Sequence, residues 1–223
     1  MNDSPLDTTF DDHDDSTPER GHVDLRPWFQ TLEDVGPTLD PQTFFAQPAP
    51  LELDIGCGRG LFIFKSSTTR LDTNFLGLEL DFKEGRRAAR RLARREQPNA
   101  RIVGGDAREV LLKKLPAGSV TAAHVYFPDP WWKKKHMRRR LFTDQFVELL
   151  SRVVMPGGHV HSWTDVEDYF VVIQGLMDHH PEFEKLPPPP EQEATSDDDY
   201  HTSFERRKRQ DGWIIHRGLW RRK

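Results

Sequence analysis

The sequence predicts an α/β fold built around a mostly parallel sheet with helices on both faces. Short apolar runs alternate with longer amphipathic or basic segments from residue 51 onwards, and this alternation is typical of a parallel sheet covered by its crossover helices. The chain has 223 residues, enough for one such domain but hardly for two independent ones. Its first apolar run ends in a glycine-rich turn, a connection that such sheets use beside a ligand.

Six apolar runs are predicted strands, and five longer segments are predicted helices. The strands are expected at 51–55, 75–80, 100–105, 120–127, 158–163 and 213–220. The helices are expected at about 61–70, 82–97, 107–114, 140–154 and 166–179. The sequence Met-Pro-Gly-Gly at 155–158 predicts a helix end and a turn before the fifth strand. Ligands of such sheets bind beyond the carboxyl ends of the strands, so the residues after each run are the informative ones.

Two segments have the composition of disordered chain. Residues 1–25 form an acidic tail rich in Asp, Ser, Thr and Pro, and the segment 187–200 is rich in Pro and acids. Neither contains enough large apolar side chains to offset the entropy of ordering. We therefore expect residues 26–223 to form a single domain that carries a mobile loop at 187–200.

The net charge of −4 conceals a basic body. Residues 1–20 contain seven acids against one arginine, so this segment alone carries −6 and the rest of the chain is +2. The basic residues are bunched, and a nucleic-acid surface can be present in this way despite an acidic isoelectric point. For any single run the alternative is a solvated helix face. The runs lie at 83–101, 133–140, 206–209 and 217–223.

Cysteine usage and hydropathy point to a reducing, aqueous compartment. Cys57 is the only cysteine, which excludes an internal disulfide. No apolar run approaches the length of a membrane span or of a signal-peptide core. We therefore expect a cytoplasmic protein with no membrane partner.

The first predicted strand ends in Asp-Ile-Gly-Cys-Gly-Arg-Gly at 54–60. Gly56, Gly58 and Gly60 let the backbone turn sharply and approach a ligand closely. A dinucleotide-binding fingerprint would need a further glycine at the next position, which is Leu61. The acid Asp54 before the turn would repel a phosphate but suits an ammonium group. A glycine-rich turn alone is a weak signal and is often only a tight connection.

Acids also follow the next three predicted strands. Glu79 ends the second strand, roughly twenty residues after the glycine turn, where a carboxylate can hold the two ribose hydroxyls of an adenosine. The third strand leads to Asp106 and the fourth to Asp129. Four acids at successive strand ends favour a cationic nucleoside ligand, and S-adenosylmethionine, with its ammonium and sulfonium, is the common one. Taken singly, Glu79 or Asp106 could instead be a helix N-cap.

The segment Phe-Pro-Asp-Pro-Trp at 127–131 falls at the end of the fourth predicted strand. Its prolines stiffen the loop and fix where the acid and the indole point. A planar base could stack on Trp131 while polar groups hold its edge, and we expect one of Trp131 and Trp132 to pack into the core instead. The basic residues at 133–140 would supply phosphate contacts beside that pocket. A pocket that suits a flat base, beside cations that suit phosphates, indicates a nucleic-acid ligand.

These motifs resemble those of the bacterial tRNA (guanine-N7-)-methyltransferase family. The resemblance rests on Asp54-Ile-Gly-x-Gly-x-Gly, on Gly77-Leu78-Glu79 and above all on FPDPWWKKKHMRRR, and it covers residues 45 to 220 approximately. It implies a Rossmann-like class I methyltransferase fold with S-adenosylmethionine as cofactor. The implied product is 7-methylguanosine in the tRNA variable loop, at tRNA position 46. The first acid of the family is more often Glu than the Asp54 found here.

The resemblance also implies roles for individual residues. Asp129 would be catalytic and would also contact the cofactor. The other cofactor-binding residues would be Asp54, Gly56, Gly58, Gly60, Glu79 and Asp106. The substrate guanine would be held by Lys133, Asp165, Thr202, Ser203, Phe204 and Glu205. The RNA would be contacted by Lys135, His136, Met137, Arg138, Arg139 and Arg140.

Two other functions stay open on the sequence. The first is a methyltransferase with the same cofactor half that acts on another RNA, a protein or a small molecule, against which only the FPDPW and TSFE segments argue. The second is a non-catalytic RNA-binding protein of the same fold, which the four strand-end acids disfavour. The expected partner is tRNA, with no metal and no membrane, and the chain would be a monomer or a homodimer.

Overall fold

The computed structural model describes residues 23–131, 133–188, 190 and 200–223. Most of the two segments expected to be disordered therefore lies outside the described residues, and so does Trp132. The prediction for Trp132 and the predictions of disorder stay untested.

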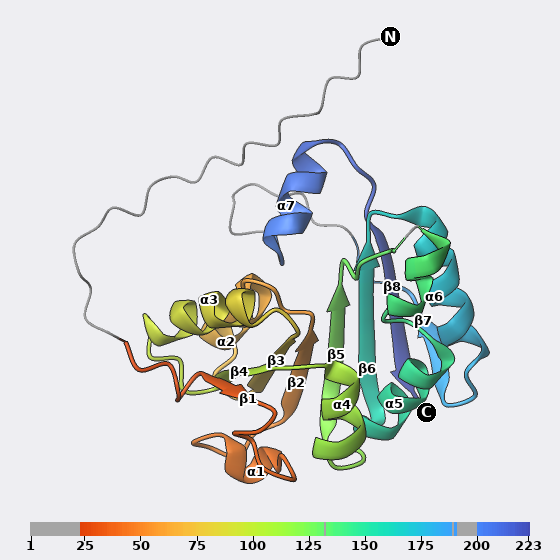
Figure 1. Cartoon of the computed structure of the whole chain (residues 1–223). Coiled ribbons are helices and arrows are strands. Elements are labelled where there is room, and N and C mark those ends of the chain that lie inside the picture. Colours follow the sequence, from red (N-terminus) through yellow and green to blue (C-terminus); the bar gives the residue numbers. More distant parts are fainter. Residues whose placement is uncertain (1–22, 132, 189, 191–199) are drawn as a thin grey trace.

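An eight-stranded sheet forms the centre of the molecule (Figure 1). The strands are β1 (Phe29–Thr31), β2 (Leu51–Ile55), β3 (Asn74–Glu79), β4 (Ala100–Gly104), β5 (Val120–Tyr126), β6 (Val154–Thr164), β7 (Phe183–Leu186) and β8 (His216–Arg222). Their order in the sheet is β1-β4-β3-β2-β5-β6-β8-β7. The strands from β1 to β6 pair in parallel, whereas β8 is antiparallel to both β6 and β7. The predicted fold class, a mostly parallel sheet with helices, is confirmed.

Helices connect and cover the strands. They are α1 (Pro41–Phe44), α2 (Leu61–Thr69), α3 (Phe82–Ala93), α4 (Ala107–Glu109), α5 (Asp144–Val153), α6 (Glu167–His179) and α7 (Ser203–Gln210), with a π-helical turn η1 (Val110–Lys114) and a 3-10 helix η2 (Lys134–Arg139). Helix α2 packs on α3 beside β3 and β4, whereas α5 packs on η1 and α6. Helix α7 stands beyond the carboxyl ends of the central strands (Figure 1). No helix in the described part of the chain combines the length and apolarity that a membrane span requires.

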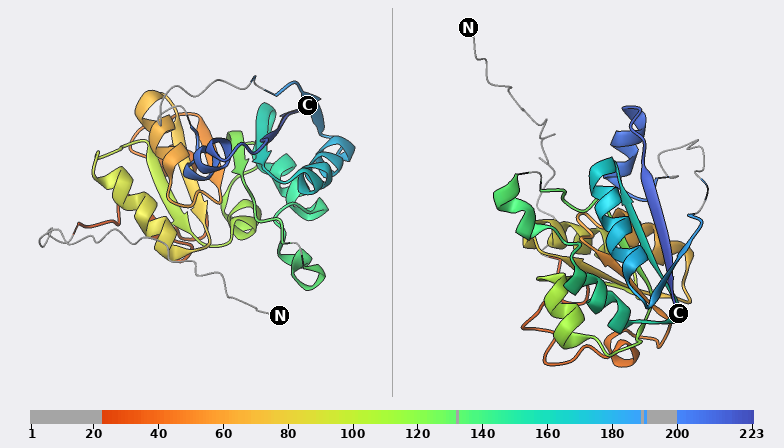
Figure 2. Two further views of the ribbon diagram at one scale, coloured as in Figure 1. Left: turned by 90° about the horizontal axis from the view of Figure 1, so that it is seen from above. Right: turned by 90° about the vertical axis from the view of Figure 1, so that its right-hand side faces the viewer.

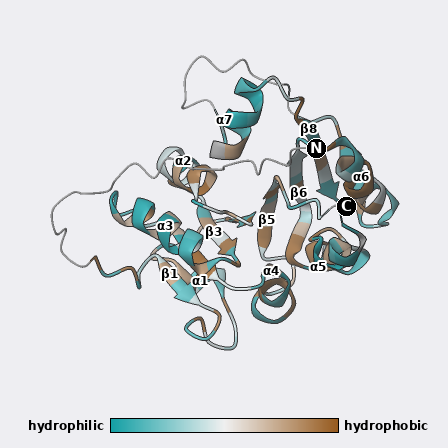
Figure 3. Ribbon diagram, turned by 45° about the horizontal axis from the view of Figure 1, so that its top comes forward, coloured by the Kyte–Doolittle hydropathy of each residue, from teal (hydrophilic) through white to brown (hydrophobic). Residues whose placement is uncertain are grey.

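The sheet is buried on both faces, because successive side chains of a strand point to opposite sides. In β3, Phe75 packs with Ile63 of α2 and Leu92 of α3. Its neighbour Leu76 belongs to the larger cluster on the other face, which includes Phe146 of α5. Parallel strands covered on both faces are apolar at nearly every position, and the central strands accordingly show mostly apolar colours in Figure 3, whereas α7 is hydrophilic.

Local capping explains several element boundaries. Helix α3 begins after Asp81, whose carboxylate accepts hydrogen bonds from the backbone N–H groups of Lys83 and Glu84. Helix α5 begins at Asp144 and not at 140 as predicted, because Thr143 caps it by accepting from the N–H of Phe146. Its predicted end is close to the observed one at Val153.

Some elements differ from the sequence prediction. The predicted turn at 155–158 is an irregular insertion within β6, where the register against β5 shifts. The predicted helix at 107–114 divides into α4 and η1. The last strand begins at His216 and not at 213. The sequence analysis did not predict β1, α1, β7, η2 or α7.

Candidate active site

A cavity of about 790 Å³ lies at the carboxyl ends of β2, β3, β4 and β5. Its size falls within the range of small-molecule sites. Three of the four strand-end acids, Glu79, Asp106 and Asp129, line it together. The parallel topology causes this convergence, because parallel strands present their carboxyl ends at one edge of the sheet.

The glycine turn after β2 has a backbone that side chains would obstruct. Gly56, Gly58 and Gly60 all have positive φ, at 77°, 52° and 67°, a region that L side chains rarely adopt. At Gly60 a Cβ atom would lie 2.7 Å from Cβ of Ala88 on α3. The turn can therefore run against α3 and begin α2 only with glycine at this position.

Glu79 ties the glycine turn to the end of β3. Its Oε2 accepts a hydrogen bond of 2.8 Å from the N–H of Gly58, and its Oε1 accepts one of 2.8 Å from the N–H of Asp81. The carboxylate retains further acceptor capacity, because an ionised carboxylate has about four lone-pair sites. Glu79 can thus hold the turn and still accept from a ligand.

Asp54 lies buried under the turn and is only 4% exposed. Burial, together with the nearby charge of Glu79, raises its pKa to about 8. Among the described residues, no cation pairs with its carboxylate and no donor forms a hydrogen bond to it. Two acids close together with no cation between them form a site that a positively charged ligand would stabilise.

Asp106 both caps a helix and lines the cavity. It is the N-cap of α4, accepting a 2.9 Å hydrogen bond from the N–H of Arg108. The Arg108 guanidinium also pairs with it at 2.8 Å, and that hydrogen bond lowers the pKa of the carboxyl. Asp106 is therefore both a helix N-cap and a residue of the cavity wall.

The segment from Phe127 to Trp131 is held in a strained conformation. Phe127 and Trp131 have φ of 52° and 42° without being glycine, and such strain is typically retained at functional sites. The N–H of Phe127 donates to the carbonyl of Trp163 at 2.7 Å, and Nε of Arg140 donates to the carbonyl of Pro130 at 2.7 Å. Asp129, between these anchors, is thus presented to the cavity by a stiff loop.

Two of the predicted RNA-contacting residues reach the cavity. Arg138 and Arg139 line the cavity, and the guanidinium of Arg139 lies 5.1 Å from the ring centre of Trp131. His136 approaches the same indole edge-on at 5.8 Å. Helix η2, which carries these residues, projects from the body of the sheet as a green turn in Figure 2. Lys135 and Met137 are exposed, and so is Lys133, which was predicted to bind the guanine.

The predicted guanine-binding residues are not gathered in this cavity. Asp165 pairs with Lys208 at 3.0 Å. Glu205 is only 2% exposed and pairs with Arg209 at 3.4 Å. Thr202 caps α7 by accepting from the N–H of Glu205, and Ser203 begins that helix.

Phe204 approaches the cavity wall. Its ring centre lies 4.9 Å from that of Phe127, which lines the cavity. The structure thus brings together Glu79, Asp106 and Asp129, three of the acids predicted to bind the cofactor, but leaves Asp165 and Glu205 in ion pairs elsewhere.

The sequence analysis missed a second cavity, of about 760 Å³, that reaches along β5 and β6. A signal for it exists in the sequence. His159 and His161 alternate on one predicted strand and His124 lies on the strand before it, where a parallel sheet is normally apolar.

Comparisons with known proteins agree with this fold. The family model described as "Putative methyltransferase" matches residues 48–217. A tRNA (guanine-N(7)-)-methyltransferase of Rhodopirellula baltica is 40% identical over 207 residues, which cover 90% of this chain and 76% of that protein. A protein of the same name from Geobacter metallireducens is 33% identical over 68% of this chain and 72% of its own length.

Two solved structures share the fold. The antibiotic-resistance methyltransferase Kmr has a TM-score of 0.52 at 18% identity, covering 82% of this chain and 89% of its own. The aminoglycoside resistance methyltransferase NpmB1 has a TM-score of 0.51 at 18% identity, covering 78% and 87%. Fold and cavity define a Rossmann-like class I methyltransferase. Within that class, the chain belongs to the tRNA (guanine-N(7)-)-methyltransferase family.

Proposed function

We propose that the chain transfers the methyl group of S-adenosylmethionine to N7 of a guanosine in tRNA, at position 46 of the variable loop, forming 7-methylguanosine. The observation that carries the proposal is the cavity in which Glu79, Asp106 and Asp129 lie with Trp131 and the cations of η2. The relative that is 40% identical over 90% of this chain supports the choice of tRNA guanine.

The residues at the cavity fit S-adenosylmethionine. Asp54 and Glu79 are close enough for burial and mutual repulsion to raise the pKa of Asp54 to about 8, and a ligand ammonium would relieve that repulsion. Glu79 and Asp106 stand where carboxylates can accept from ribose hydroxyls and from an adenine amino group. When bound, the cofactor supplies an electrophilic methyl group on a positively charged sulfur.

Methyl transfer to guanine N7 requires little proton transfer by the protein. Guanine N7 carries a lone pair and can attack a methyl group without first losing a proton, so no general base is required. Positive charge moves onto the purine as the reaction proceeds. Asp129 at the cavity wall would stabilise that charge, because a fixed carboxylate in a partly dry site acts without reorganising. The stiff loop around Asp129 would also keep the reacting atoms aligned.

Recognition of the guanine would use residues that are paired in the structure without substrate. Asp165 and Glu205 could accept from the N1 and N2 hydrogens of guanine, a pattern that adenine does not offer. In this proposal the guanine edge competes with Lys208 for Asp165 and with Arg209 for Glu205. Lys133 would hold the substrate from the side of η2, together with the segment from Thr202.

The RNA backbone would lie against η2. Arg138 and Arg139 are exposed cations beside the base-stacking Trp131, which is the arrangement expected when phosphate contacts position a base for reaction. The other exposed residues of this segment, Lys135 and Met137, would extend the same surface.

Mass spectrometry of nucleosides tests the proposal directly. Bulk tRNA lacking 7-methylguanosine would be incubated with the purified protein and S-adenosylmethionine carrying a labelled methyl group. The expected result is label in 7-methylguanosine alone, mapped to the variable loop by sequencing of digested fragments. Label in another nucleoside, or none in any, would refute the assignment.

A further inference from the structure

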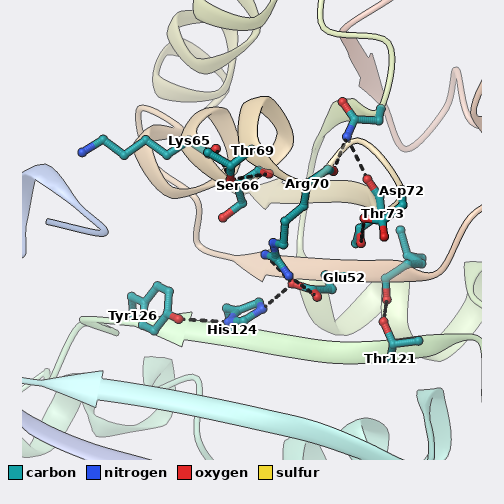
Figure 4. Close-up of polar contacts among 12 residues, drawn as sticks. Glu52, Lys65, Ser66, Thr69, Arg70, Asp72, Thr73, Thr121, His124 and Tyr126 are labelled. Carbon is teal, nitrogen blue, oxygen red and sulfur yellow. Dashed lines mark hydrogen bonds and ion pairs between the residues drawn. The ribbon is translucent and has the colours of Figure 1, made fainter. Parts of the chain in front are cut away.

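Two paired acids of the structure differ in how many partners they have. Glu52 on β2, which lines the second cavity, accepts hydrogen bonds from Arg70 at 2.6 and 2.9 Å, and its Oε2 lies 2.9 Å from Nε2 of His124 (Figure 4). Asp165 pairs with Lys208 at 3.0 Å and, within the described part of the chain, with no other side chain. An ionised carboxylate has about four lone-pair sites, so Asp165 retains acceptor capacity that a ligand can use.

The ring of Phe204 on α7 lies between Lys208 and the wall of the first cavity. Its centre is 5.2 Å from Nζ of Lys208 and 4.9 Å from the ring centre of Phe127, which lines that cavity. Asp165 directly follows β6, and β6 pairs in parallel with β5, the strand that leads into the loop of Asp129. The ion pair therefore stands at the same edge of the sheet as the acid at the reacting centre.

The position of the Lys208 ammonium group is fixed by its surroundings. The preceding residue of α7, Arg207, is exposed, whereas the side chain of Lys208 is only 22% exposed and that of Asp165 only 10%. Nζ of Lys208 lies 4.3 Å from the ring centre of Trp213, whose N–H donates to the carbonyl of Lys208 at 2.9 Å. Contacts of a cation with aromatic faces are attractive. The rings of Phe204 and Trp213 can thus hold this ammonium group even when Asp165 binds a ligand.

The ion pair presents a hydrogen-bond donor beside an acceptor, and guanine presents the complementary pattern. On its Watson–Crick edge O6 accepts, and the adjacent N1 and N2 carry hydrogens, whereas adenine has an amino group in place of O6. The ammonium group of Lys208 can donate to O6 while the carboxylate of Asp165 accepts from N1 and N2. Adenine would place its amino group against the ammonium and its N1 lone pair against the carboxylate.

We propose that Lys208 is a specificity-determining residue that donates a hydrogen bond to O6 of the target guanine and acts as a unit with Asp165. The inference rests on the proposed function and adds a donor to the acceptors assigned there. Guanine takes an oxygen of Asp165 from Lys208, and the ammonium group, kept nearby by Phe204 and Trp213, bonds to O6 instead. The pair has no net charge, so it does not oppose the positive charge that moves onto the purine during methyl transfer.

The alternative role of Lys208 is structural, as one half of an ion pair that docks α7 against the end of β6. Such a role supports methyl transfer to every base alike. A hydrogen bond to O6 contributes only when the base carries that oxygen. Exchanging the base therefore separates the two roles, because two groups in contact show non-additive effects when both are changed.

A cycle of protein and RNA substitutions tests this inference. Transfer RNAs carry guanosine, inosine or 2-aminopurine riboside at the target position of the variable loop; 2-aminopurine retains N7 and the 2-amino group but lacks O6 and the N1 hydrogen. Lys208→Met is expected to lower kcat/KM about tenfold with guanosine or inosine, which both carry O6, and less than about twofold with 2-aminopurine. An RNA that is methylated too slowly to follow is compared by its Kd in the presence of S-adenosylhomocysteine.

The ratio of guanosine to 2-aminopurine is measured with one preparation of each variant, so the fraction of folded enzyme cancels. Lys113→Met, which removes an exposed ion pair with Glu109 at 2.9 Å, should leave the ratio unchanged. Lys208→Arg, which keeps a donor and the charge, should retain most of the preference for guanosine. Equal losses with all three RNAs in Lys208→Met overturn this inference alone and assign Lys208 to the docking of α7. Absence of methyl transfer to the guanosine tRNA by the parent overturns the proposed function, and this inference with it.

Discussion

The two cavities use carboxylates in opposite ways. Beneath the first, Asp54 is buried near Glu79 and, among the described residues, has no cation paired with it, and its pKa is raised to about 8. In the second, Glu52 is clamped by Arg70 and His124, and its pKa is lowered to about 2. Both cavities are of similar volume and share the wall at Tyr126.

The difference separates a binding acid from a structural one. An acid that folding leaves unpaired stores unfavourable energy that a cationic ligand can release, whereas an acid that folding pairs stabilises the chain and is unavailable to ligands. The pairing state of a carboxylate therefore indicates its role better than its burial does. Opposite effects of pH on stability are the clearest consequence.

The largest expected effect concerns the unpaired acid. Because the pKa of Asp54 is raised on folding, the stability that its proton supports is fully present below about pH 4 and is lost as pH rises through about 8. In urea titrations without cofactor, Asp54→Asn should not show this loss. The free energy of unfolding of the variant minus that of the parent should therefore increase by about 1.4 kcal/mol per pH unit over that window.

The same variant provides the functional control. Asp54→Asn should bind S-adenosylmethionine more weakly, by roughly ten- to a hundredfold, since the amide offers no negative charge to the ligand. Parallel stability curves for parent and variant would mean that Asp54 is ionised and paired in the folded chain, and the contrast between the cavities would disappear.

The second effect concerns the acid at the reacting centre. Asp129→Asn should slow single-turnover methyl transfer by about 10²- to 10³-fold, as loss of one preorganised electrostatic group does elsewhere. At saturating cofactor and tRNA, the parent rate should be nearly flat between about pH 6 and 8.5. The exposed change Asp144→Asn serves as the matched control. A tenfold rise per pH unit that vanishes in Asp129→Asn would reinstate a general base.

The paired acid should show the opposite dependence on pH. The pKa of Glu52 is depressed on folding, so its stabilisation is present above about pH 4.5 and is lost as pH falls through about 2. Glu52→Gln should therefore be less stable than the parent at neutral pH, and the gap should close by about 1.4 kcal/mol per pH unit below pH 4.5. Chemical denaturation at several pH values measures this. A gap that is constant across the acid range would show that Glu52 is not clamped.

The smallest expected effect lies at the rim of the first cavity. Replacing Arg138 and Arg139 with Ala should raise the KM for tRNA several-fold and flatten its dependence on salt, since fewer counterions are released on binding. Affinity for S-adenosylmethionine should not change. Arg94 and Arg95, which follow α3 on another side of the sheet, give a double-alanine control with the same loss of charge. If both double variants lower the salt slope equally, η2 has no special role.

Much of the fold follows from local sequence pattern. The strand predicted at 51–55 is β2 without any change in its bounds, because its apolar residues Leu51, Leu53 and Ile55 lead directly into the glycine turn. Helices α2 and α6 also begin and end within one residue of their predicted bounds. These elements are long or have clear start and stop signals in the sequence, so tertiary contacts shift their ends little.

Other elements depend on contacts that local pattern does not contain. Strand β1 is three residues long and forms by pairing with β4 at the sheet edge. Helix α7 is a basic, hydrophilic segment. It begins after its Thr202 cap, and the carboxylate of Glu205 accepts a hydrogen bond from the N–H of His201. The burial of such residues depends on partners distant in the sequence.

The candidate site shows the same division. Glu79, Asp106 and Asp129 converge because strand order brings their loops together, which the alternating pattern predicts. The pairing of Asp165 with Lys208 and of Glu205 with Arg209 depends on where α7 docks. Sequence reasoning assigned these residues to the guanine, and that assignment stays a prediction.

The most direct test of the central claim uses a tRNA with 7-deazaguanosine at position 46 of its variable loop. This substitution removes the N7 lone pair and retains the Watson–Crick edge. In single-turnover reactions with labelled S-adenosylmethionine, we expect rapid methylation of unmodified tRNA and none of the 7-deaza tRNA, which should still bind with similar affinity. Methyl transfer to the 7-deaza tRNA at a comparable rate would contradict the central claim.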